Sequence, residues 1–306
     1  MIDINYRILD LVERTGSLTR TAEILHLTPS AVSHSIKKME ERLGMQILIR
    51  NRDGVRLTVT GMELLPHIRF MIRAEERIQQ EISRIGGLRA DTLHLGVFSS
   101  VGCCWLPDLI RIMKEQCPQV EIHVHEDSYA GLENSLANGE LNAAFVSLPV
   151  AGRLPSYPLL RDRLLCVAPK DFRPANGSYV TISEMLEQTF ILPHKESDFD
   201  AAAFLKENHI DSLNAPHSIR EDAVIIALVK SGLGMTIMPE LVLNNINDDV
   251  NAYPIETAPY RTIGIALQRH EYVTPAARSF VKVVQQYIAD RYPEEKPYFR
   301  ADEAMK

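Results

Sequence analysis

Apolar and polar positions alternate at helical spacing through the first part of the chain. Ile8 and Val12 lie one turn apart and predict a first amphipathic helix that ends near Gly16. A second helix is expected over residues 18–26, with the Ser17 hydroxyl as its N-cap. The chain therefore begins with short helices joined by tight connections.

A third helix is expected from Pro29 to about Leu43. Thr28 is a suitable N-cap, proline is favoured at the first helical position, and Gly44 is a natural stop. The face opposite its apolar stripe carries short polar and basic side chains: Ser30, Ser33, His34, Lys37 and Lys38. This pattern is typical of a helix-turn-helix, whose second helix presents such side chains to the major groove of DNA.

Two short alternating strands follow the third helix and flank Asp53-Gly54, a strong hairpin signal. A hairpin after a recognition helix is a wing, and its arginines can contact phosphates or a minor groove. We therefore predict a mostly α, winged helix-turn-helix domain over residues 1–59. The candidate DNA-binding residues are Thr28, Pro29, Ser30, Ser33, His34, Lys37, Arg50, Arg52 and Arg56. The alternative is that this basic face is an ordinary solvated surface.

A long helix is expected from Thr60, its predicted cap, to Ile85, and Gly86-Gly87 ends it. One apolar stripe, which includes Leu64 and Ile68, runs along it beside a charged outer face. Such a helix would be roughly 40 Å long. A single apolar seam needs a partner, so residues 60–87 are predicted to be a dimerisation linker. The alternative is that the helix packs on the chain's own C-terminal domain.

Beyond Asp91, strands alternate with helices, which predicts an α/β domain over residues 91–306 with mostly parallel sheets. Parallel sheets bind ligands at the carboxyl ends of their strands. Six candidate effector-binding residues follow such strands: Ser99, Ser100, Val101, Ser128, Ser147 and His194. Because Ser99 and Ser100 precede a helix, an anion or carboxylate is expected there. The serines could instead be helix caps, and Asp198, Glu221 and Asp222 could equally serve a cationic or polar ligand.

The charge distribution agrees with a DNA-binding head on an acidic body. The chain has 306 residues and a net charge of -7, but residues 1–60 hold nine basic and seven acidic side chains. The first sixty residues thus have a net charge of +2 and the rest of the chain has a net charge of -9. A basic first segment suits a module that contacts DNA phosphates. The sequence shows neither a signal peptide nor an apolar stretch that could span a membrane, so a cytoplasmic protein with reduced cysteines is expected.

Catalytic and cofactor motifs are not found in the sequence, so we expect no enzyme activity, no cofactor and no metal site. It has no nucleotide-binding glycine loop, HExxH, GxSxG or CxxC pattern. Cys103 and Cys104 are adjacent in the sequence and lie near the expected cleft. Their role could be thiol-based sensing or ordinary packing. His123 and His125 share one strand face and could ligate a metal, but no third ligand has a convincing spacing.

The motifs of the first sixty residues resemble the DNA-binding segment of LysR-type transcriptional regulators. The resemblance covers the run GSLTRTAEILHLTPSAVSHSIKKMEERLGMQILIRNRDGVRLTVTG almost without gaps. The family often has phenylalanine where this chain has Ile49, and arginine where it has His34; the second difference affects the expected base preference. The rest of the chain resembles the family's effector domain more loosely, at Leu106-Pro107 and over residues 136–145 and 227–239.

The resemblance implies two lobes like those of periplasmic solute-binding proteins. Lobe one is expected over 91–162 and 268–306 and lobe two over 163–267, with hinge crossings near Asp162 and Gln268 and a ligand cleft between the lobes. It also implies a bacterial transcription regulator that forms a homodimer or homotetramer on double-stranded DNA with two-fold symmetry, binds a small-molecule effector and has no membrane partner. A contact with RNA polymerase is compatible with this role. The competing functions are an enzyme built on the two-lobed fold and a plain solute-binding module.

Overall fold

The computed structural model describes residues 4–51, 54–85, 91–150, 154–194, 199–210, 213–244, 249–268 and 273–293. These residues form two compact units, which we treat separately. The N-terminal unit is Met1–Asp91 with Asn138–Glu140, and the C-terminal unit is Thr92–Ala137 with Leu141–Lys306. The helices of the described part include none that is both long and apolar enough to cross a membrane.

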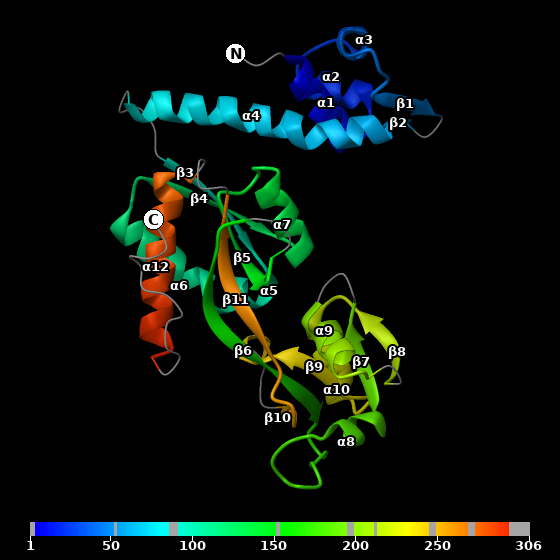
Figure 1. Ribbon diagram of the computed structural model, residues 1–306, viewed down its shortest axis with the longest axis vertical. Helices are drawn as coiled ribbons and strands as arrows, with labels where there is room; N and C mark the ends of the chain where they lie inside the picture. The colour runs from blue at the N-terminus through cyan, green and yellow to red at the C-terminus, as the bar shows by residue number, and fades with distance from the viewer. Residues whose placement is uncertain are drawn as a thin grey trace. The chain divides into compact units, whose positions relative to one another are not determined.

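The N-terminal unit is a winged helix-turn-helix followed by a long helix, as predicted (Figure 1). Its elements are α1 (Ile4–Thr15), α2 (Leu18–Ile24), α3 (Pro29–Leu43), β1 (Leu48–Asn51), β2 (Gly54–Leu57) and α4 (Val59–Ile85). The Thr28 hydroxyl accepts a hydrogen bond from the backbone N–H of Ala31, and Gly44 ends α3 with φ at 68°. Strands β1 and β2 pair antiparallel and form the wing.

Helix α4 begins differently from the prediction. The hydroxyl of Thr58, not that of Thr60, caps it, because the Gly61 N–H donates to Thr58 Oγ1 at 3.0 Å. The first turns of α4 pack on the core of the unit through Leu65 and Ile68, which are nearly inaccessible to solvent. Farther along, Ile78 and Ile82 are 59% and 57% exposed. The helix therefore carries apolar surface that its own unit does not cover.

The C-terminal unit contains one seven-stranded sheet and a separate parallel pair (Figure 1). The large sheet has the order β10-β6-β11-β5-β3-β4, and β9 also pairs with β6. Its strands are β3 (Asp91–Val97), β4 (Val120–Glu126), β5 (Ala143–Leu148), β6 (Ser156–Pro169), β9 (Thr236–Pro239), β10 (Val250–Pro254) and β11 (Tyr260–Leu267). The pair is β7 (Thr189–Pro193) with β8 (Asn214–Ile219).

Eight helices flank these strands in the part of the unit that the structure describes. They are α5 (Ser99–Cys104), α6 (Leu106–Gln116), α7 (Tyr129–Ala137), α8 (Ile182–Leu186), α9 (Phe199–Glu207), α10 (Asp222–Lys230), α11 (Glu240–Leu243) and α12 (Pro275–Arg291). The alternation of helices and strands confirms the α/β prediction. The expectation of mostly parallel sheets is wrong, because β6 and β11 run in opposite directions and pair antiparallel with each other and with β5, β9 and β10.

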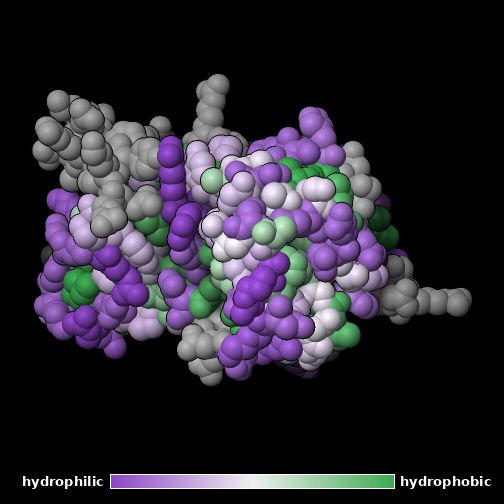
Figure 2. All heavy atoms as spheres, turned by 90° about the horizontal axis from the view of Figure 1, so that it is seen from below, coloured by the Kyte–Doolittle hydropathy of each residue, from purple (hydrophilic) through white to green (hydrophobic). Residues whose placement is uncertain are grey.

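Strand β6 links two lobes that have their own cores. Phe145 and Phe280 are fully buried in the first core, whereas Phe190 and Ile237 are fully buried in the second. Strand β11 lies in the first core through Ile263 and Leu267. The predicted lobe limits, with crossings near Asp162 and Gln268, remain a prediction. The face shown in Figure 2 is mostly hydrophilic, with small separate apolar patches.

Candidate functional site

The predicted DNA-binding side chains of α3 lie on its outer face. Thr28, Pro29, Ser30, His34 and Lys37 are all exposed, while the apolar stripe of the helix is buried in the core. Lys37 lies 3.8 Å from Glu41 in an exposed pair of the kind that contributes little to stability. Its ammonium group can therefore leave Glu41 for a phosphate at small cost. This helix face is accessible along its first three turns.

A hydrogen bond that the sequence did not suggest joins the tip of a wing arginine to the recognition helix, α3. The Arg50 guanidinium on β1 donates to Ser33 Oγ at 2.8 Å, which brings two of the candidate residues together. Arg56 on β2 is exposed, and Arg52 lies outside the described residues. The structure thus places Arg50 at the junction of helix and wing.

Two further residues, Glu40 on α3 and Gly61 on α4, contact the start of the wing. The Glu40 carboxylate accepts from the backbone N–H groups of Ile47 and Leu48, at 2.9 and 3.1 Å. A Cβ at Gly61 would lie 2.4 Å from the Ile47 carbonyl oxygen, so only glycine allows this approach. Glu40 was missed because an acidic residue on a helix reads as solvated surface. Glu40 thus ties α3 to the start of the wing, and Gly61 allows α4 to approach the same segment closely.

A second candidate site is a cavity of about 470 Å³ in the C-terminal unit. Its walls come from both lobes and include three of the predicted effector residues, Ser99, Ser100 and Ser128. The Val101 side chain is fully buried in the first core and does not line the cavity. Ser147 and His194 are also not among its lining residues. The structure thus brings three of the six predicted residues together.

The serines differ in how far they act as helix caps. Ser128 Oγ accepts from the Gly131 N–H at 3.3 Å, which supports the capping interpretation for this residue. Ser99 and Ser100 are the first two residues of α5, and its N-cap is Phe98. Their hydroxyls are therefore not N-caps, and that of Ser100 has a different partner.

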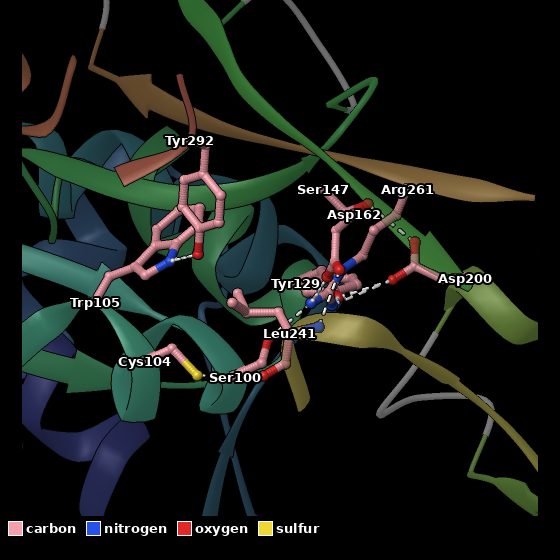
Figure 3. A network of polar contacts seen from close by, with 10 residues as sticks. All are labelled: Ser100, Cys104, Trp105, Tyr129, Ser147, Asp162, Asp200, Leu241, Arg261 and Tyr292. Carbon is pink, nitrogen blue, oxygen red and sulfur yellow. Dashed lines mark hydrogen bonds and ion pairs between the residues drawn. The ribbon is translucent and has the colours of Figure 1, made fainter. Parts of the chain in front are cut away.

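Arg261 lines the cavity and lies at the centre of a network of polar contacts (Figure 3). The residue is 5% exposed, and its guanidinium donates to Asp162 Oδ2 at 2.8 Å, to Ser100 Oγ at 2.8 Å and to the Tyr129 hydroxyl. Asp162 also accepts from the backbone N–H of Leu241 at 3.0 Å. The positive charge of Arg261 is thus balanced within the protein, and its main donors are occupied.

Asp200 connects the two lobes beside Arg261 (Figure 3). This carboxylate lies on α9, next to Ala201 of the second core. It accepts from the Tyr129 hydroxyl at 2.9 Å and from Ser147 Oγ at 3.0 Å, and both donors belong to the first lobe. Ser147 therefore has a structural partner on the opposite lobe. Sequence reasoning placed Ser147 at a strand end but could not find this contact.

Carboxylates outnumber guanidiniums around the cavity. The lining contains four acidic side chains, Glu126, Asp127, Glu221 and Asp222, and two arginines, Arg220 and Arg261. Burial raises the pKa of Asp222; the Arg261 charge opposes this rise and the Glu221 charge adds to it. The electrostatics of this cavity therefore do not favour an anion.

The other groups singled out in the sequence are His123 and His125 on β4 and Cys103 and Cys104 on α5. His94 joins His123 and His125 on neighbouring strands, with His94 Nδ1 3.4 Å from His125 Nε2. No set of three or more ligands that could hold a metal is found among the described residues. The Cys104 thiol donates to the Leu241 carbonyl oxygen at 3.2 Å, whereas Cys103 is exposed.

Comparison with known proteins decides the family. A sequence model described as "LysR substrate binding domain" matches residues 86–289, and one described as "Bacterial regulatory helix-turn-helix protein, lysR family" matches residues 5–62. The chain belongs to the LysR family of DNA-binding transcription regulators. The resemblance found in the sequence and the two-domain fold expected from it are thereby confirmed.

Individual relatives agree over nearly the full length. The chain is 28% identical to the probable HTH-type transcriptional regulator LrrA of Synechococcus elongatus, over 92% of this chain and 95% of that protein. Its fold is similar to that of a full-length OxyR variant from Pseudomonas aeruginosa, with 21% identity, a TM-score of 0.67 and coverage of 94% and 95%. Full-length CbnR in complex with its target DNA gives 16% identity, a TM-score of 0.66 and coverage of 94% and 99%.

Proposed function

We propose that this LysR-type regulator binds a two-fold symmetric operator through α3 and the wing, and that a small molecule bound between the lobes of its C-terminal unit modulates this binding. The observation that carries the first part is the exposed face of α3, with Arg50 hydrogen-bonded to Ser33 at its edge. The similar CbnR has been crystallised with its target DNA. The proposed DNA contacts remain those predicted from the sequence, including Arg52.

The proposed assembly is a homodimer or a homotetramer held by α4. Ile78 and Ile82 are more than half exposed and lie one turn apart on this helix. Exposed apolar side chains at this spacing form a seam that a second copy of the helix can cover. Two recognition helices would then meet two half-sites about one turn of DNA apart.

The proposed effector site is the cavity of about 470 Å³, within the range of known small-molecule sites. Ligand binding between lobes can favour one relative arrangement of them and so change how the assembly engages DNA. A contact with RNA polymerase and a cytoplasmic location are part of the same proposal. A carboxylate effector, which the sequence suggested, stays untested, and the charges of the lining do not favour it.

An enzyme on this fold is the second candidate function. It would need a nucleophile or general base with a suitable partner at the cavity. In the described part of the lining, Asp222 has a raised pKa, but burial is the largest cause and no nucleophile pairs with it. We therefore do not favour catalysis.

The DNA-binding part is tested by placing a negative charge on the exposed face of α3. Ser33→Glu places a carboxylate at the predicted groove-facing position and is expected to lower affinity for promoter DNA by about five- to 150-fold, since one base-edge contact is worth about 1–3 kcal/mol. Ser178→Glu is the matched control, because Ser178 is exposed in the C-terminal unit. Equal affinity of the two variants in a gel-shift titration would contradict the proposal.

A further inference from the structure

We propose that the effector is an organic cation, a metabolite with one or more amine or guanidine groups, held by Glu126, Glu221 and Asp222. The proposal rests on the proposed function, because it names the ligand class of the same cavity. It departs from the carboxylate that the strand ends and the helix start suggested. Three features of the cavity support the cation proposal. The lining has more negative than positive charges, the hydrogen-bond donors of Arg261 already have partners within the protein, and the carboxylates come from both lobes.

The charge balance is negative even before the surrounding residues are considered. Four carboxylates and two guanidiniums line the cavity. One of the two guanidiniums, that of Arg261, lies 2.6 Å from Asp162 and 3.6 Å from Asp200, which are both nearly inaccessible to solvent. The two aspartates therefore balance the Arg261 charge, and the lining as a whole carries an excess of negative charge. A carboxylate ligand would meet a net repulsive field.

Arg261 cannot easily turn to an anionic ligand. Its Nε and Nη2 groups face Asp162, Nη2 also donates to Ser100 Oγ, and Nη1 donates to the Tyr129 hydroxyl. A ligand carboxylate that drew the guanidinium away would leave Asp162 buried without its counter-charge, which is strongly unfavourable. The buried Arg261 guanidinium therefore acts as the counter-ion of Asp162, and Ser100 Oγ acts as a hydrogen-bond acceptor for Arg261.

Three of the carboxylates are available to a ligand. Within the described part of the chain, the side chains of Glu126, Glu221 and Asp222 make no hydrogen bond or ion pair. The fourth, Asp127, already accepts from the Ser128 N–H at 2.7 Å. Glu221 is the N-cap residue of α10 but forms no side-chain capping bond. Stabilisation of the helix start alone would account for Glu221 and Asp222, but not for Glu126 on the other lobe.

The carboxylates come from both sides of the cleft. Glu126 ends β4 in the first lobe, and Glu221 and Asp222 begin α10 in the second. Without a cation between them these like charges repel, and a bound amine attracts both sets at once. Such a ligand would favour the closed arrangement of the lobes, which gives the cavity charge a direct role in the response.

The test uses the full-length protein and two series of probes that differ only in charge. The first series is the straight-chain α,ω-diamines of three to six carbons, and the second is the dicarboxylates of the same lengths, both followed by isothermal titration calorimetry. At least one diamine is expected to bind with a Kd at least tenfold lower than that of every dicarboxylate. Tighter binding of a dicarboxylate, or binding of neither series, would overturn the proposal.

Variants locate the binding. Asp222→Asn and Glu221→Gln are each expected to raise the diamine Kd at least tenfold, whereas Glu187→Gln, an exposed control outside the cavity, leaves it unchanged. Unchanged diamine binding in both cavity variants would place the cation elsewhere and overturn the assignment. Promoter binding of the unmodified protein, measured in parallel, separates the two proposals: if it persists while diamines do not bind, only the cation inference fails.

Discussion

Replacing Arg261 by methionine tests whether this side chain is a structural counter-ion or a ligand-binding group. The substitution keeps much of the side-chain volume and removes the charge and its donors. It leaves Asp162, whose side chain is 3% exposed, without its ion pair. Removing one partner of a buried pair typically costs about 3–5 kcal/mol. In a unit of this size, 1 kcal/mol lowers Tm by about 2–4 °C, so the expected loss is about 6–20 °C.

The neighbouring exposed pair provides the control. Arg163 donates twice to Glu240, at 2.9 and 2.6 Å, but its side chain is 62% exposed. An exposed pair is worth about 0–1 kcal/mol, so Arg163→Met should lower Tm by no more than about 4 °C. The assay is thermal unfolding followed by circular dichroism, with differential scanning calorimetry as a check that the same transition is compared.

A double substitution completes the cycle. Asp162→Asn keeps an acceptor for the Leu241 N–H and removes the charge that Arg261→Met would strand. The double variant should therefore recover part of the lost stability, with a coupling energy between about 0.5 and 3 kcal/mol. If Arg261→Met is no more harmful than Arg163→Met, or if the two effects simply add, Arg261 is not held by Asp162. The argument that it is unavailable to an anionic effector would then fail.

Three further predictions concern the wing, the thiols and pH. Glu40→Ala removes the acceptor for two backbone N–H groups and should destabilise the N-terminal unit by about 1–3 kcal/mol and weaken promoter binding. Glu40→Gln retains an acceptor oxygen and should lose less stability. Equal losses of unfolding free energy in chemical denaturation would refute this role of Glu40. Burial raises the pKa of Cys166 to about 12, so a thiol reagent should modify exposed Cys103 in the native protein and Cys166 only after unfolding. Mass spectrometry of the labelled peptides measures the order of reaction, and labelling of Cys166 before Cys103 would contradict this prediction. Because burial raises the pKa of Asp222, this carboxylate is protonated at a higher pH than an ordinary aspartate, so diamine affinity should weaken as pH falls, and Asp222→Asn should reduce this pH dependence; calorimetry that shows the same pH dependence in both proteins would contradict a role for Asp222 in binding.

The N-terminal unit could be predicted closely because its signals are local. The Thr28 cap, the proline after it and the Gly44 stop act within one or two turns, and the structure shows each of them. The start of α4 was the exception, since Thr58 and Thr60 are both suitable caps and only the closing of the wing selects the first. Arg50 could be assigned to the wing, but its bond to Ser33 depends on how the hairpin folds back.

The effector site could be predicted only in part because its residues are distant in the chain. The strand-end rule located Ser99, Ser100 and Ser128. It failed for Val101, because successive helical positions point about 100° apart and this one turns into the core. Arg261 and Asp162 lie in strands that are mostly apolar, a sign that each needs a partner, but they are 99 positions apart in the sequence, which gives no indication of the pairing.

The most direct test of the regulator assignment is binding of the purified protein to its own promoter DNA across a salt series, with random duplex as the competitor. The account predicts a log–log slope steeper than about -4, because two recognition helices and two wings would together displace at least about five counterions. It also predicts a clear preference for a dyad sequence over random DNA. A flat salt response, or no binding at low salt, would contradict the assignment.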